Sequence, residues 1–214
     1  MAVLPPRRRV SRPLLIALIA TWTLVGGGGL AVSALHGAQG TAVGASPPLW
    51  PSASRLERVA ERPTLLIFAH PRCPCTRATI RELERLLART GNAFEVRLAL
   101  FHPTGTPASW SSGALWDDAA SIPGVTVVGD EGGAEARRFD ATSSGTVLLY
   151  DRSGVLRFRG GITPARGHEG DSAGAESIVR WVHGGQADPR SMVFGCPIWN
   201  EQGLETKWRL SWRQ

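Results

Sequence analysis

One uncharged run near the N-terminus constrains this chain more than any other feature. Residues 13–35 (PLLIALIATWTLVGGGGLAVSAL) contain no charged side chain. As a helix, a run of this length is about 35 Å long, enough to cross a hydrocarbon core of about 30 Å. The sequence therefore predicts one transmembrane helix over residues 13–35.

The charges around this run predict its orientation. Residues 1–12 are basic and carry four arginines: Arg7, Arg8, Arg9 and Arg12. No acidic residue occurs before Glu57. The positive-inside rule keeps such a basic segment in the cytoplasm. We therefore expect a single-pass protein of the inner (cytoplasmic) membrane, with everything after the helix on the extracytoplasmic, periplasmic side.

A cleaved signal peptide is the alternative interpretation of the same run. Ala31 and Ser33 have the small-residue spacing of a cleavage site. The apolar stretch is longer than the usual core of about 7 to 15 residues, which favours a retained anchor.

The net charge of +6 depends on the N-terminal arginines. Without those four, the 24 Lys and Arg fall to 20, against 18 Asp and Glu. A phosphate-binding domain concentrates positive charge on one face or helix. This near-balance excludes nucleic acid as an expected partner.

The rest of the chain divides by composition. Residues 36–55 are expected to form a linker, because the stretch up to residue 54 is rich in Gly, Ala, Ser and Pro and has no Lys, Arg, Asp or Glu. Residues 56–187 are expected to form the folded domain. Residues 188–214 form a C-terminal tail rich in tryptophan.

Strand-like and helix-like segments alternate within residues 56–187, which is typical of an α/β domain. The continuous apolar run TLLIFA predicts a strand buried on both faces. Strands are expected over residues 64–69, 94–101, 125–128, 147–150 and 155–158. Helices are expected over residues 76–89, 134–139 and 177–183.

Two cysteines lie where the first strand of this domain turns into a helix. The helix dipole and the unpaired amides of a first turn favour a thiolate at Cys73 or Cys75. His70, Arg72 and Arg77 add positive or protonatable groups nearby. An exported chain meets conditions that oxidise thiols. Redox or metal chemistry is therefore favoured over simple packing.

Cys196 and a glycine-rich loop are further candidates. Cys196 can resolve a bond to Cys73 or Cys75 if the tail folds back, or can be a free or intermolecular thiol. In the loop of residues 160–174, Arg166 or His168 can turn toward the cysteines as a charge partner, acid or base, or ligand. Alternatively this is a surface loop with Asp171 or Ser172 as a helix N-cap, and His70 only satisfies a backbone group.

Three segments together resemble the thioredoxin-like superfamily: FAHPRCPC before an amphipathic helix, VTVVGDEGGAEARRF, and SGTVLLYDRSGVLRFRGG. A membrane-tethered chain of this type is similar to bacterial thiol-disulfide proteins of cytochrome maturation and envelope redox control. The resemblance implies a four- or five-stranded mixed sheet flanked by helices. It also implies protein thiols or disulfides as substrates.

The chain departs from that family at two places. The family motif is Cys-x-x-Cys, and a gapless match puts Arg72 at the first cysteine and Cys75 at the second, so a shift of the nucleophile by one residue is one interpretation, with Cys73 and Cys75 both remaining candidates. Gly145 and Thr146 stand where the family carries a cis-proline followed by threonine. A Cys73–Cys75 disulfide would close a small strained ring, which is easily reduced.

The leading expectation is a thiol-disulfide oxidoreductase that needs no cofactor. A thiolate of Cys73 or Cys75 attacks a substrate disulfide, and a second cysteine resolves the mixed disulfide. The first alternative is a copper-binding, metallochaperone-like module, because Cys73 and Cys75 with an imidazole from His70 or His168 suit Cu(I). A thiol peroxidase is a second alternative, although the family's Pro-x-x-x-Thr-x-x-Cys pattern is missing. A structural adaptor is the third.

Overall fold

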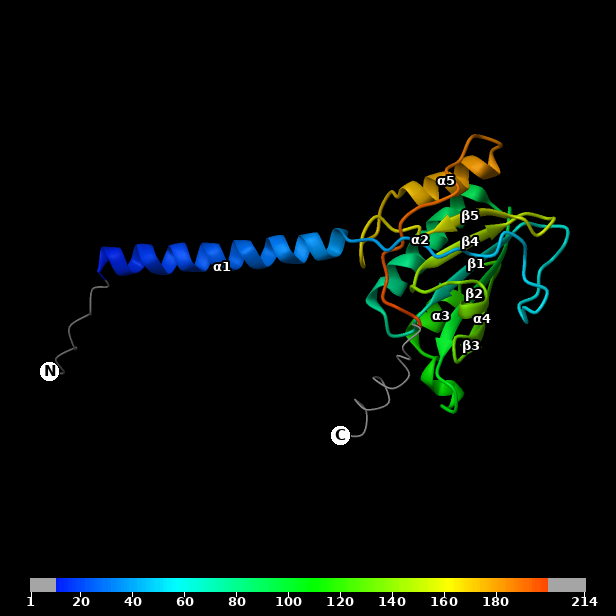
Figure 1. Cartoon of the computed structure of the whole chain (residues 1–214), viewed down its shortest axis with the longest axis horizontal. Coiled ribbons are helices and arrows are strands. Elements are labelled where there is room, and N and C mark those ends of the chain that lie inside the picture. The colour runs from blue at the N-terminus through cyan, green and yellow to red at the C-terminus, as the bar shows by residue number, and fades with distance from the viewer. Residues whose placement is uncertain (1–10, 200–214) are drawn as a thin grey trace. The chain divides into compact units, whose positions relative to one another are not determined.

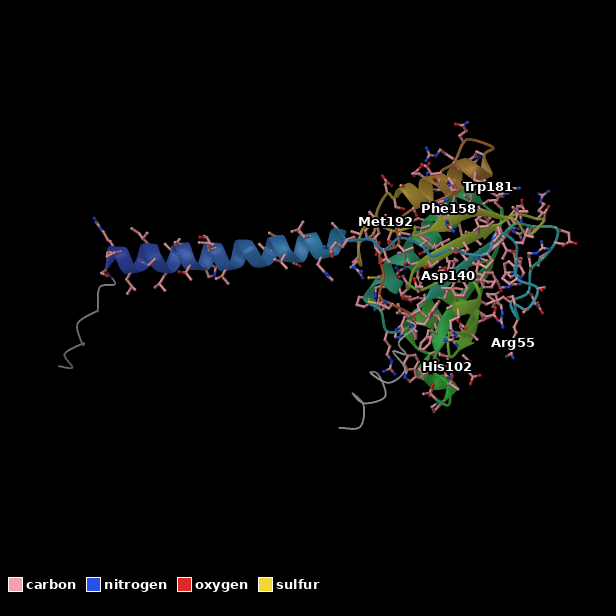
Figure 2. All side chains as sticks on the ribbon, in the orientation of Figure 1. Arg55, His102, Asp140, Phe158, Trp181 and Met192 are labelled. Carbon is pink, nitrogen blue, oxygen red and sulfur yellow. The ribbon has the colours of Figure 1, made fainter. Side chains whose placement is uncertain are left out.

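The computed structural model describes residues 11–199, which divide after Ala38 into two units. The first unit is helix α1 (Arg12–Ala38), in which no residue is buried. Its side chains project all round the helix (Figure 2). By length and composition, α1 can cross a membrane. The helix predicted over residues 13–35 is confirmed.

A five-stranded sheet forms the second unit, in the order β3-β2-β1-β4-β5 (Figure 1). Strands β1, β2 and β3 are mutually parallel, and β4 runs antiparallel to both β1 and β5. The predicted mixed α/β sheet is confirmed. The strands are β1 (Thr64–Ala69), β2 (Glu95–His102), β3 (Val125–Glu131), β4 (Thr146–Tyr150) and β5 (Leu156–Gly160).

Three helices and one 3-10 turn lie between these strands, and a fourth helix, α5 (Ala173–Val182), follows the last strand. Those between the strands are α2 (Pro74–Thr90), η1 (Ala108–Trp110), α3 (Ala114–Ala120) and α4 (Ala134–Arg138). The sequence missed η1 and α3, because prolines and glycines interrupt any helical apolar pattern there. Helix α5 begins earlier than expected, since the Ser172 hydroxyl oxygen accepts a hydrogen bond from the Ala175 amide at 3.2 Å.

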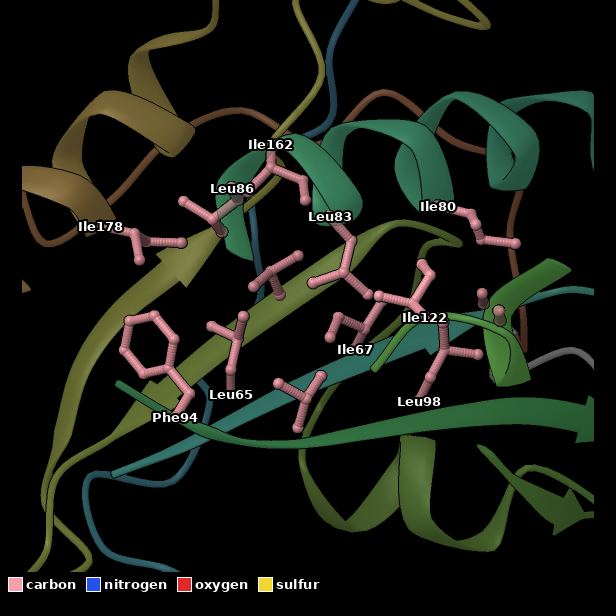
Figure 3. Close-up of a cluster of buried hydrophobic side chains, with 14 of the residues drawn as sticks. Leu65, Ile67, Ile80, Leu83, Leu86, Phe94, Leu98, Ile122, Ile162 and Ile178 are labelled. Carbon is pink, nitrogen blue, oxygen red and sulfur yellow. The ribbon is translucent and has the colours of Figure 1, made fainter. Parts of the chain in front are cut away.

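Strand β1 lies at the centre, and its side chains alternate between two cores. Leu65 and Ile67 belong to a cluster with α2 and α5, which includes Leu83 and Ile178 (Figure 3). Phe68 belongs to the cluster on the other face of the sheet. Burial on both faces makes β1 a fixed base for the turn that follows it.

The segment expected to be a linker lies along the domain instead. The Trp50 amide donates to Gly154 O at 2.8 Å, and the Tyr150 hydroxyl donates to Pro47 O at 2.9 Å. The Trp50 ring packs edge-on against Phe139 and Tyr150, with centroids 5.0 and 5.2 Å away. Composition cannot reveal this packing, because it depends on where the Trp50 ring packs and not on how many apolar residues the segment contains.

The tail also packs on the domain as far as the structure describes it. Thr41 pairs with Val193, and the Gly161 amide donates to Met192 O at 3.2 Å. The rest of the predicted tail, residues 200–214, lies outside the described residues.

Replacing Trp50 tests whether residues 39–55 are part of the fold. We expect Trp50→Ala to lower the free energy of unfolding by about 2 to 3 kcal/mol, because it removes a half-buried aromatic side chain. Leu49→Ala is the control: Leu49 is 61% exposed, so a change below about 0.5 kcal/mol is expected. Urea unfolding of the full chain in detergent measures both. Equal, small effects would mean that the segment is a free linker.

Candidate active site

Cys73 and Cys75 lie where β1 passes into α2. Cys73 is the N-cap of α2, with an extended backbone (φ −94°, ψ 124°), and Pro74 occupies the first helical position, where its fixed φ suits a helix start. Cys75 follows in the first turn. Cys73 is 2% exposed and Cys75 6% exposed.

Buried hydroxyl groups hold this turn in place. The Cys73 amide donates to His70 O at 3.1 Å, and the Thr76 hydroxyl donates to the same oxygen at 2.8 Å. Ser144, in the loop before β4, accepts a hydrogen bond from the His70 amide at 3.0 Å through Oγ. Its Oγ also lies 2.9 Å from Thr76 Oγ1. Through Ser144, the loop before β4 is therefore hydrogen-bonded to the cysteine turn.

His70 has a structural position in this turn. Its Nδ1 accepts a hydrogen bond from the Arg72 amide at 3.1 Å, and its ring stacks on Phe101 with centroids 5.5 Å apart. Burial, and then the positive charge of Arg72, lower the pKa of His70 to about 4. The ring is neutral near pH 7 and satisfies a backbone group.

The tail brings Cys196 to the other two cysteines. The Ser144 amide donates to Cys196 O at 2.8 Å, and the Ile198 amide donates to Thr142 O at 2.8 Å. A Cβ atom at Gly195 would lie 1.7 Å from Ser144 O, so only glycine permits this approach. The tail therefore folds back toward Cys73 and Cys75, as a resolving role for Cys196 requires.

The three thiols have different pKa values because they interact. Burial alone would raise the pKa of Cys73, but hydrogen bonds from the thiol and amide of Cys196, and from the amide and thiol of Cys75, lower it. Burial and the negative charge of Cys73 raise the pKa of Cys75. Burial and the interaction with Cys73 raise the pKa of Cys196 to about 12. Cys73 is therefore the thiol that ionises first.

The glycine-rich loop turns Arg166, rather than His168, inward. An Arg166 guanidinium nitrogen donates to Gly195 O at 2.6 Å, and its positive charge favours the ionised forms of Cys75 and Cys196 against burial. His168 is exposed, with Nδ1 2.8 Å from Arg166 O. Arg166 therefore contributes charge to the site and fixes the tail.

Two interactions that involve acidic side chains join this loop to helix α2. The Gly170 amide donates to buried Glu82 of α2 at 2.7 Å. Arg85 pairs with Glu169 at 2.8 Å. The N-cap predicted at Asp171 or Ser172 is Ser172.

Gly145 and Thr146, two further predicted residues, lie in the loop before β4 and at the start of that strand. Gly145 has φ +88°, and its amide donates to Phe68 O at 2.8 Å. The hydroxyl of Thr146 donates to Ser143 O at 2.7 Å.

Two predicted arginines lie on the cysteine side of the site. The Arg72 guanidinium lies 4.5 Å from the centre of the Trp110 ring. Arg77 is exposed on α2.

A cavity of about 570 Å³ lies beside Cys73. Residues 71–74 and Arg77 line one side, and residues 109–116 line the other. Sequence reasoning missed this second wall, as it missed Ser144, because no spacing relative to the cysteines marks either of them. Within residues 11–199, no group of three or more His, Cys, Asp or Glu side chains is arranged to hold a metal ion.

The Gly195–Ser144 approach can be tested directly. Gly195→Ala puts a methyl group against a backbone oxygen, so we expect the tail to detach and Cys196 to react with a maleimide at least about tenfold faster, as in local opening. Hydrogen exchange at the Ser144 amide should rise with it. Gly129→Ala is the control, because a Cβ there meets nothing within 4 Å. Unchanged rates in Gly195→Ala would contradict the described tail position.

Comparisons with known proteins bear on the fold. No protein-family model and no curated protein matches the sequence. An uncharacterised conserved protein from Geobacillus kaustophilus is similar in structure, with TM-score 0.55 and 20% identity, over 77% of this chain and 91% of that one.

Two other solved structures are similar at lower scores. A secreted Mycobacterium tuberculosis disulfide oxidoreductase homologous to E. coli DsbE has TM-score 0.41 and 14% identity, over 57% of this chain and 81% of that one. The exposed lipoprotein thioredoxin Etrx1 from Streptococcus pneumoniae has TM-score 0.42 and 15% identity, over 57% and 84%. Such identities concern the fold and not the activity. With its mixed sheet and a cysteine turn between β1 and α2, the domain has the thioredoxin-like fold that the sequence predicts.

Proposed function

We propose that this chain is a membrane-tethered thiol-disulfide oxidoreductase whose domain works on the extracytoplasmic side. The observation that carries the proposal is that Cys75 and Cys196 both interact with Cys73 and lower its pKa. A thiolate is the attacking species in disulfide exchange. Cys73 is the nucleophile, and protein disulfides are the expected substrates.

The first step forms a mixed disulfide. The Cys73 thiolate attacks one sulfur of a substrate disulfide, and the other sulfur leaves as a thiolate that takes a proton. The negative charge of Cys73 then disappears. Because that charge is one cause of the raised pKa values of Cys75 and Cys196, both thiols ionise more readily after the first step.

The second step releases the substrate, and Cys196 is the better placed thiol for it. Its thiolate attacks the Cys73 sulfur, the substrate's second sulfur leaves and is protonated, and a Cys73–Cys196 disulfide remains. The substrate has gained two electrons and the protein has lost them. Cys75 is separated from Cys73 only by Pro74, so their disulfide would close a small strained ring. Cys196 comes from a distant segment and has no such restriction.

Helix α1 supports the location. It is long and apolar enough to span a membrane, and the arginines before it keep the N-terminus in the cytoplasm by the positive-inside rule. The domain then lies in a compartment where disulfides persist.

Redox titration of the full chain in detergent, without metal and with peptide mapping, tests this proposal. We expect a reversible Cys73–Cys196 disulfide. Cys73→Ser should reduce the single-turnover reduction of a protein disulfide by at least about a hundredfold, because it removes the attacking group. Cys196→Ser should accumulate the mixed disulfide, and Cys75→Ser should still resolve it.

Other outcomes would overturn the proposal in distinct ways. Three thiols that stay free or oxidise only irreversibly would exclude exchange and direct attention to Cu(I) binding. Consumption of hydrogen peroxide with a sulfenate on one cysteine would indicate a thiol peroxidase. A reversible Cys73–Cys75 disulfide would keep the activity but reassign the resolving residue.

A further inference from the structure

The cavity beside Cys73 gives this site a substrate preference. We propose that it binds low-molecular-weight disulfides that carry carboxylate groups, and that Arg77 recognises those carboxylates while Cys73 reacts with the sulfur. This inference rests on the proposed exchange activity of Cys73. It adds the class of a substrate that nothing in the comparisons assigns.

The size and position of the cavity favour a small molecule. Its volume of about 570 Å³ falls within the roughly 300 to 1,000 Å³ typical of small-molecule sites. Cys73 lines this cavity although only 2% of its surface is exposed. A small disulfide can enter the cavity and reach the Cys73 sulfur.

The charge of the walls favours an anion. Arg72 and Arg77 both line the cavity, and none of its described lining residues is acidic. Arg77 is exposed, and a guanidinium group binds a carboxylate through two parallel hydrogen bonds. Arg72 lies with its guanidinium carbon 4.5 Å from the centre of the Trp110 ring, which keeps a second positive charge at the cavity wall.

The opposite wall suits the rest of such a molecule. Trp110 and Trp116 provide aromatic surface for a carbon chain, and two exposed serines, Ser109 and Ser112, provide hydroxyl groups for amide or carboxylate oxygens. Ser111 is buried between them, and its Oγ lies 3.1 Å from His102 Nδ1. The two walls therefore offer positive charge, aromatic surface and hydroxyl groups around one reactive sulfur.

The reaction with such a substrate is balanced by the protein's own thiols. The Cys73 thiolate displaces one half of the small disulfide as a thiol, and Cys196 displaces the other half. Two small thiols are released, and the protein keeps a Cys73–Cys196 disulfide. A single turnover therefore needs no other reductant.

The experiment compares small disulfides of different charge. Full chain in detergent, carrying Cys75→Ser and Cys196→Ser so that the product is trapped, is mixed with oxidised glutathione or with neutral bis(2-hydroxyethyl) disulfide. Mass spectrometry measures the rate of mixed disulfide formation at Cys73. We expect oxidised glutathione to react about tenfold faster, and Arg77→Ala to slow its reaction by a much larger factor than that of the neutral disulfide, so that the advantage is lost.

Arg81→Ala is the matched control. Arg81 is exposed one turn further along α2, pairs with Glu84 at 3.5 Å and does not line the cavity. It should leave both rates unchanged. Equal rates for the two disulfides, or equal losses in Arg77→Ala and Arg81→Ala, would overturn this inference while leaving the exchange activity intact.

Two further outcomes separate this inference from the alternatives. A peptide disulfide whose cysteine is flanked by aspartates serves as a third probe. If only this peptide reacts faster than the neutral disulfide, the cavity recognises acidic protein segments and the small-molecule inference is wrong. If Cys73 reacts with none of the probes in the chain that keeps Cys75 and Cys196, the proposed exchange activity itself fails.

Discussion

The contact between the tail and the loop before β4 is the interaction on which the site depends. The Ser144 amide holds the Cys196 carbonyl at 2.8 Å, and Arg166 holds the adjacent Gly195 carbonyl at 2.6 Å. These bonds place a third cysteine beside a pair that the β1–α2 turn already positions. Without them, Cys73 would lose the thiol and amide of Cys196 that lower its pKa.

Burial and hydrogen bonding act in opposite directions at this site. Burial penalises a thiolate, because a low dielectric disfavours charge. The same low dielectric strengthens hydrogen bonds to an ionised sulfur. At Cys73 the hydrogen bonds prevail, whereas at Cys196 burial and the neighbouring charge prevail. One cluster of identical side chains thus contains one thiol with a lowered pKa and two thiols with raised pKa values.

The sequence predicted the scaffold better than the site. Apolar runs and turn residues located all five strands, and apolar residues at helical spacing located α2, because β1 is buried on both faces and α2 on one. It missed α3 and the packing of Trp50, since these depend on contacts distant in the chain. The cysteines were found from their place at a helix start, and Cys196 from being an unpaired thiol in the tail. Ser144 carried no local signal, because its importance comes from the segments it joins.

Titration of the Cys73 thiolate tests the account most directly. Ultraviolet absorbance of the full chain, with Cys73→Ser subtracted, measures its pKa, and Cys196→Ala measures the contribution of the tail. We predict a pKa below the ordinary cysteine value of about 8.5, and a rise when Cys196 is replaced. A Cys73 pKa at or above the ordinary value, or one that Cys196→Ala leaves unchanged, would contradict the claim that the tail activates the nucleophile.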